Sequence, residues 1–230
     1  MRLIRTPPSP PAFNLALDEA LLRSGTPTLR LYSWDPPGFS LGFFQKFATL
    51  NAPPGFEVVR RPTGGGAIAH VGELTICWVG QRRRVDDVYA DINAIVRSAL
   101  EGSFGLGAGF GSGQPEAAPA GLCFDAHTCY DLMLNGRKVF GSAQRRGGER
   151  FLLHGSLVLA RNPASTGAIS LEEMLGRLVT REEAEAAIMN AAATHWSVAL
   201  TPSEPTAAEL AAADRLVHDR YANPAWTERR

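Results

Sequence analysis

Apolar residues recur at helical spacing in some stretches of the chain and alternate with polar residues in others. Phe13, Leu17 and Leu21 stand four positions apart after a proline-rich lead-in, which predicts a helix over 13–23 that packs on a sheet. The same spacing predicts a second helix over 92–100. Alternating stretches bounded by Gly or Pro predict strands, which we expect to form one sheet, over 28–34, 40–44, 56–61 and 66–80.

The second half of the chain carries strong turn and capping signals. Apolar residues of segment 130–134 alternate into Asn135-Gly136, which predicts a hairpin because both residues tolerate positive φ. A strand is predicted over 151–160, and segment 105–121 is too rich in Gly, Ala and Pro for regular structure. Three capping boxes predict helix starts at Ser170 with Glu173, Thr180 with Glu183, and Thr206 with Glu209. Strands early and helices late predict an α+β fold, with residues 1–230 forming one domain.

The amino-acid composition of the chain argues against several classes of protein. Hydrophobic residues make up 45% of the chain and charged residues 20%, so neither disorder nor a fibrous repeat is indicated. Lys plus Arg equals Asp plus Glu at 23 each, without the basic excess that nucleic-acid binding favours. No stretch has the length of a signal-peptide core or of the about 20 apolar residues of a membrane span. We therefore expect a cytoplasmic protein with no nucleic-acid or membrane partner.

The three cysteines lack paired spacing, which favours free thiols over a disulfide framework or a structural zinc site. No metal and no cofactor are predicted. Cys77 lies in an apolar strand and is expected in the core, and Cys129 beside a strand start is expected to be structural. Cys123 ends the Gly-rich segment 105–121, where exposure is expected, although most unpaired cysteines are simply buried apolar residues.

Segment 60–70, RRPTGGGAIAH, joins two arginines to three consecutive glycines within a strand-rich region. Glycines weaken a strand, so they indicate either a tight turn with solvated arginines or a place where a ligand approaches the main chain. Segment 135–144, NGRKVFGSAQ, places Lys138 just past the predicted turn, where a lone lysine is usually solvated. Neither motif alone distinguishes a functional site from a solvated turn.

A resemblance to a known family favours the functional interpretation of both motifs. FNLALDEALL, LRLYSWDPPGFSLGFFQ, RRPTGGGAIAH, CFDAHTCYDLMLNGRKVFGSAQRR and LLHGSLVL occur in the order and spacing seen in the lipoate-protein ligase and octanoyltransferase superfamily. The closing PAWTERR also resembles a C-terminal signature of this group. The resemblance implies the α+β catalytic domain shared by biotin and lipoate protein ligases, a mixed, mostly antiparallel sheet flanked by helices. One departure is Val71, where the family usually has Asp after the histidine of the glycine motif.

Within the superfamily, CFDAHTCYDL resembles the cysteine-dependent octanoyltransferases. A thiolate exchanges with an acyl thioester almost isoenergetically, and a nearby cation such as Lys138 would raise the thiolate fraction or stabilise the oxyanion. Cys123 and Lys138 are therefore the expected catalytic residues. The resemblance places His70 and His154 beside the acyl pocket as binding or orienting groups, and His127 is not assigned as a base. The expected substrate-binding residues are Arg60, Arg61, Thr63, Gly64, Gly65, Gly66, Ala67, His70, Gly141, Ser142, Ala143, His154 and Gly155.

The resemblance implies an acyltransferase of lipoate biosynthesis. It would move an octanoyl or lipoyl group from octanoyl acyl carrier protein, through a Cys123 thioester, to a lysine of a lipoyl domain or of the glycine-cleavage H protein. One alternative is the catalytic subunit of an ATP-dependent lipoate-protein ligase whose accessory domain is a separate polypeptide. Another is a non-catalytic binder of lipoyl domains, against which the presence of both Cys123 and Lys138 argues.

Overall fold

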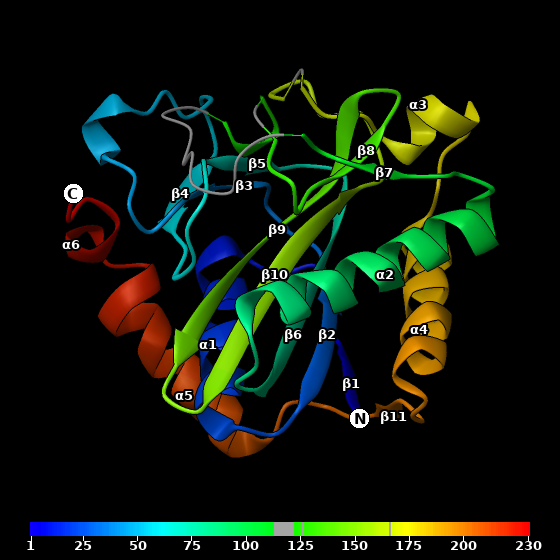
Figure 1. Cartoon of the computed structure of the whole chain (residues 1–230). Helices are drawn as coiled ribbons and strands as arrows, with labels where there is room; N and C mark the ends of the chain where they lie inside the picture. Colours follow the sequence, from blue (N-terminus) through cyan, green and yellow to red (C-terminus); the bar gives the residue numbers. More distant parts are fainter. Residues whose placement is uncertain (113–121, 126, 166) are drawn as a thin grey trace.

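The computed structural model describes residues 1–112, 122–125, 127–165 and 167–230. Two sheets and a set of helices make up this part of the chain (Figure 1). Most of the predicted loop 105–121 lies outside the described residues. Within the described ranges, no helix has the length and apolar character needed to cross a membrane.

The large sheet is mixed and mostly antiparallel, as predicted. Its central strands β2, β6, β10, β9 and β8 pair antiparallel, and β1 pairs parallel with β2 on one side and with β11 on the other. The spatial order is β11 (Thr201–Pro202), β1 (Arg2–Arg5), β2 (Thr28–Tyr32), β6 (Glu73–Gln81), β10 (Arg150–Val158), β9 (Arg137–Gly147), β8 (Leu132–Leu134) and β7 (Gly109–Phe110).

A second, three-stranded sheet was not predicted. It has the order β4 (Glu57–Arg60), β3 (Gly38–Leu41) and β5 (Ile68–His70). The expected single strand over 66–80 is wrong, because the chain turns at Gly72, which has a φ of +60°. A Cβ at Gly72 would lie 2.9 Å from the Ala160 side chain, so the turn favours glycine in both conformation and space. The turn sends β5 into the small sheet and β6 into the large one.

Helices cover both faces of the large sheet. Along β6, Ile76 and Trp78 pack in the core beneath α2 and α4, whereas Cys77 and Val79 pack beneath α1 and α5. This alternation is that of a strand buried on both faces. The helices are α1 (Pro11–Ser24), α2 (Val85–Phe104), α3 (Leu171–Leu175), α4 (Arg181–Trp196), α5 (Ala207–Leu216) and α6 (Pro224–Thr227), with a π-helical turn at Val217–Tyr221 and 3₁₀ turns at Phe47–Thr49 and Cys123–Asp125.

The local signals of the second half are confirmed. Asn135 and Gly136 both have positive φ, 48° and 73°, and join β8 to β9 as a tight hairpin. The pairing of these strands shifts between Leu132 and Met133, which marks a β-bulge. All three predicted capping boxes form at the starts of α3, α4 and α5.

Candidate active site

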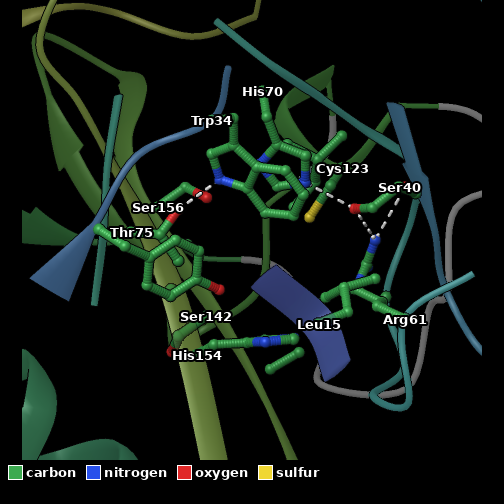
Figure 2. A pocket seen from close by; sticks show the side chains of 16 residues that line it. Leu15, Trp34, Ser40, Arg61, His70, Thr75, Cys123, Ser142, His154 and Ser156 are labelled. Carbon is green, nitrogen blue, oxygen red and sulfur yellow. Dashed lines mark hydrogen bonds between the residues drawn. The ribbon is translucent and has the colours of Figure 1, made fainter. Parts of the chain in front are cut away.

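A pocket lies between the two sheets and α1 (Figure 2). Its lining comes from α1, β2, β3, β5, β6, β9, β10, the glycine segment and the 3₁₀ turn at Cys123. Most of that lining is apolar carbon, with a few polar groups converging on the space, which is the usual character of a small-molecule site. The sequence segments singled out by resemblance thus meet around one cavity.

Cys123 presents its Sγ to this pocket from a fixed backbone. Its N–H donates to the Ala67 carbonyl at 2.7 Å, and its own carbonyl accepts from Lys138 Nζ at 2.7 Å. The residue is half-buried, unlike Cys77 in the core. Cys129 is exposed, so the expectation of a structural Cys129 is not met. Cys123 is therefore the thiol placed to react with a molecule in the pocket.

Lys138 lies beside this thiol and is almost fully buried. Its Nζ is 4.0 Å from Cys123 Sγ and 2.9 Å from Asp131 Oδ2. The same Asp131 oxygen accepts from the Thr128 N–H at 2.6 Å and from its hydroxyl at 3.1 Å. Asp131 thus holds the ammonium against the turn that carries Cys123, where a positive charge stabilises a thiolate.

Arg61 shapes the glycine segment around itself. Its guanidinium donates to the Gly64 carbonyl at 2.7 Å, the Gly66 carbonyl at 2.6 Å and the Ser40 carbonyl at 3.1 Å. Burial lowers the pKa of Arg61 to about 10, although the negative charges of Cys123 and Glu73 raise this pKa and partly offset the shift. Arg61 is therefore a second cation near the thiol.

Gly65 fills the position between this guanidinium and the thiol. It has a φ of +89°, and a Cβ there would lie 2.8 Å from Arg61 Nη2 and 4.0 Å from Cys123 Sγ. A side chain at this position would meet both the arginine and the reactive sulfur. The glycine segment is thus a close-approach site rather than a solvated turn.

His70 is held on both ring nitrogens. Nδ1 lies 2.7 Å from Glu73 Oε1, and Nε2 lies 2.7 Å from Ser40 Oγ. Its ring stacks on Trp34 with the centroids 3.7 Å apart. Glu73 also accepts from the hydroxyls of Thr75 and Ser156, both at 2.8 Å. With both nitrogens engaged, His70 orients one wall of the pocket.

His154 occupies the part of the pocket nearest α1. Its Nε2 lies 2.6 Å from Thr63 Oγ1 and its Nδ1 lies 3.4 Å from Asp18 Oδ2. Burial lowers the pKa of His154, although the neighbouring Asp18 partly offsets this shift. Burial alone would raise the pKa of Asp18, but the Arg30 charge and the His154 hydrogen bond outweigh it and lower that pKa. His154 is thus a neutral, anchored ring at neutral pH.

The structure separates the expected site residues by distance from the pocket. Arg60 points away from it: the guanidinium donates to the carbonyls of Gly42, Gln45 and Thr227 at 3.0, 2.7 and 2.9 Å. A second group lies behind the lining and makes hydrogen bonds to the residues that form it: Lys138, Thr63, Gly64, Gly66 and Ala67. The expected residues that line the pocket are Cys123, Arg61, Gly65, His70, Gly141, Ser142, Ala143, His154 and Gly155.

Several polar or aromatic residues of the site were not predicted, among them Tyr32, Thr75 and Ser156 of the pocket lining. Trp34, Ser40 and Glu73 surround His70, and Asp131 pairs with Lys138. Asp131 had a sequence signal, because it precedes the strand that the hairpin folds back onto Lys138. Among the described residues, no cluster of three or more His, Cys, Asp and Glu side chains could hold a metal ion.

Comparison with known proteins identifies the family. Residues 10–193 match the lipoyl protein ligase A/B catalytic domain. The chain belongs to this family. Octanoyltransferase LipM of Geobacillus kaustophilus is 33% identical over 96% of this chain and 95% of its own length. The LipM proteins of Kyrpidia tusciae and Bacillus subtilis are 33% and 30% identical, each over 100% of this chain and 98% of the relative.

Solved structures of this family and of biotin protein ligases share the fold. A putative lipoate protein ligase of Thermoplasma acidophilum with bound lipoic acid has a TM-score of 0.86 at 22% identity, over 100% of this chain and 98% of that one. Lipoate-protein ligase A bound with ATP has a TM-score of 0.85 at 21% identity, over 99% and 98%. Biotin protein ligase from Aquifex aeolicus has 0.56 at 11%, over 85% and 70%. The predicted α+β fold is confirmed.

Proposed function

We propose that this chain is an octanoyltransferase that carries the acyl group on Cys123. The donor would be octanoyl acyl carrier protein, and the acceptor a lysine of a lipoyl domain or of the glycine-cleavage H protein. Alignment with proteins named octanoyltransferase along nearly their whole length supports the reaction class. The observation that carries the mechanism is the Cys123 thiol in the pocket with Lys138 Nζ 4.0 Å away.

The first half-reaction transfers the acyl group to the protein. The Cys123 thiolate attacks the carbonyl carbon of the donor thioester, and a tetrahedral oxyanion forms. The bond to the donor sulfur then breaks, and the departing thiolate takes up a proton. Because one thioester replaces another, the acyl group stays activated without nucleotide.

The second half-reaction forms the amide. The uncharged amine of the acceptor lysine attacks the Cys123 thioester, the C–N bond forms and the C–S bond breaks. The proton that the amine loses passes to the released sulfur, which restores the thiol. The pocket holds the acyl chain through both steps.

Lys138 and Asp131 act together in this proposal. Lys138 Nζ contacts the Cys123 carbonyl at 2.7 Å, so it lies at the same side of the turn as the reacting sulfur. Its ammonium stabilises the thiolate and donates to the oxyanion. Asp131 is a positioning residue, since it touches the ammonium and not the acyl group.

Intact-mass analysis tests the proposal directly. The wild type mixed with octanoyl acyl carrier protein should gain the mass of one octanoyl group, and Cys123→Ser should gain none. Cys129→Ser is a matched control because Cys129 is an exposed free thiol; this variant should acylate normally. An unmodified wild type, or equal acylation of Cys123→Ser, contradicts the thioester mechanism. Lipoate- and ATP-dependent exchange of pyrophosphate would instead identify a ligase.

A further inference from the structure

The C-terminal motif PAWTERR, residues 224–230, packs against the small sheet beside the site. Figure 1 shows α6 next to β4. The Trp226 indole donates to the Arg60 carbonyl at 2.9 Å, and the Arg60 guanidinium donates back to the Thr227 carbonyl at 2.9 Å. The Phe47 N–H donates to the main-chain oxygen of Arg230 at 2.7 Å. These bonds fix the motif to β4 and to the 3₁₀ turn at Phe47–Thr49, which comes after the segment that follows β3.

That segment, residues 42–45, is also packed on the glycine segment. The Phe43 N–H donates to the Thr63 carbonyl at 2.8 Å. A Cβ at Gly64 would lie 3.9 Å from the Phe44 ring, and one at Gly42 would lie 1.9 Å from the Gly65 carbonyl oxygen. The Phe44 ring therefore lies beside the glycine segment at Gly64, next in sequence to Gly65, which lines the pocket.

Two arginines of the motif stand over these aromatic rings. The Arg229 guanidinium carbon is 3.9 Å from the centre of the Phe43 ring and 3.8 Å from that of Trp226. The Arg230 guanidinium carbon is 5.6 Å from the centres of both Phe43 and Phe44. Both arginines are exposed, and so is 64% of Phe44. The rings of Phe43, Phe44 and Trp226 therefore lie beneath two cations close to the glycine segment.

The guanidinium groups of Arg229 and Arg230 form no ion pair within the described part of the chain, although the exposed Glu228 precedes them in the motif. Burial first, and then the charges of Arg230, Arg220 and Arg145, lower the pKa of Arg229. Of these cations, Arg220 pairs with Glu19, whereas Arg229 and Arg230 pair with no described Asp or Glu. Such an arrangement attracts an acidic partner.

We propose that Phe44, Arg229 and Arg230 form a docking surface for an acidic face of the acyl carrier protein. The inference rests on the proposed function. The thioester is chemically the same on a protein carrier and on a small thiol, so preference for a protein donor requires contact outside the pocket. The exposed ring and the guanidinium groups without ion pairs supply apolar and charged contacts beside the glycine segment that lines the pocket of Cys123.

The test compares a protein donor with a small one. Arg229→Glu/Arg230→Glu is assayed for single-turnover acylation of Cys123 by octanoyl acyl carrier protein and by octanoyl-pantetheine. Arg82→Glu/Arg84→Glu is the matched control, because both arginines are exposed in the connection between β6 and α2 and give the same change in net charge. We expect kcat/KM for the carrier protein to fall about tenfold or more, with a weaker salt dependence than the wild type shows. The reaction with octanoyl-pantetheine should change by less than about twofold.

Phe44→Ala is a second variant, since a largely exposed ring is removed with little effect on folding. It should lower kcat/KM for the carrier protein and not for octanoyl-pantetheine. Equal rates of the charge-reversal variant and the wild type with the carrier protein overturn the inference. So does a loss shared by both donors, a matching loss in the control variant, or a defect only in transfer to a lipoyl domain. A wild type that neither donor acylates refutes the proposed function itself.

Discussion

Replacing Lys138 with alanine should affect folding and catalysis by different routes. The lysine is nearly fully buried, and its Nζ contacts Asp131 at 2.9 Å and the Cys123 carbonyl at 2.7 Å. Lys138→Ala leaves the buried Asp131 carboxylate with only Thr128 as a described partner. Breaking a buried ion pair in this way costs about 3–5 kcal/mol of the free energy of unfolding, against a typical total of about 5–15 kcal/mol.

The expected loss in the rate of acyl transfer corresponds to a rise in activation free energy similar in size to this loss of stability. Removal of one oxyanion donor slows acyl transfer about 10²- to 10³-fold, which corresponds to roughly 3–4 kcal/mol. A second substitution separates the two effects. In Lys138→Ala/Asp131→Asn the lone carboxylate is gone, so part of the stability should return, while acylation of Cys123 stays slow.

Two measurements are needed. Urea unfolding gives the free energy of unfolding of each variant. Rapid-quench intact mass gives the single-turnover rate of Cys123 acylation at saturating donor, under conditions in which each variant is folded. Lys138→Arg should also lose most of this rate, with little dependence on ionic strength. A Cβ at Gly141 would lie 3.2 Å from Lys138 Cδ, so the lysine stem runs along a wall that fits a planar guanidinium poorly.

Two results would refute the catalytic role of Lys138. Near-normal single-turnover rates in Lys138→Arg would mean that only the charge matters. Recovery of both stability and rate in Lys138→Ala/Asp131→Asn would mean that the lysine serves the fold alone.

Three further substitutions test the surroundings of the pocket. Gly65→Ala should slow Cys123 acylation and cost about 1–2 kcal/mol in urea unfolding, because φ is +89° and its Cβ would meet Arg61; Gly64→Ala, with room for a Cβ, should be affected less. Arg60→Met should lower the free energy of unfolding by about 3 kcal/mol or more by leaving buried carbonyls unpaired, while octanoyl-pantetheine still acylates the folded protein. Because burial lowers the pKa of His154, the unfolded chain binds its proton first as pH falls through about 6.5. Acidification to pH 5.5 should thus destabilise the wild type more than His154→Gln, by up to about 1.4 kcal/mol per pH unit, and equal urea-unfolding losses would contradict this.

Features set by neighbouring residues were predictable from the sequence. The Asn135-Gly136 hairpin and the three capping boxes form because their hydrogen bonds and dihedral preferences involve residues a few positions apart. The placement of Cys123 and Lys138 at one site followed from family resemblance. No local rule brings the turn at Cys123–Asp125 onto the hairpin that carries Lys138.

Features that depend on distant contacts were not predictable. Arg60 and Arg61 are adjacent, yet Arg61 faces the pocket and Arg60 faces the C-terminal motif. The sequence of their shared motif does not indicate this difference in orientation, because the orientation of Arg60 depends on packing against α6. The break between β5 and β6 depends likewise on Gly72 meeting Ala160, far along the chain. Asp131 reaches Lys138 through a β-bulge that strand alternation does not reveal.

The pairing of β6 with β10 has a consequence during protein synthesis. It joins Cys77 to His154, and Thr63 reaches His154 across 91 positions of the chain. A nascent chain that has emerged only as far as α2 therefore contains the glycine segment but neither Cys123 nor the opposite wall of the pocket. The pocket can therefore form only late in translation, after β10 has left the ribosome. Pairing β10 with β6 also costs loop-closure entropy, because the two strands are far apart in the sequence. A product terminated before β10 would be unable to assemble the pocket.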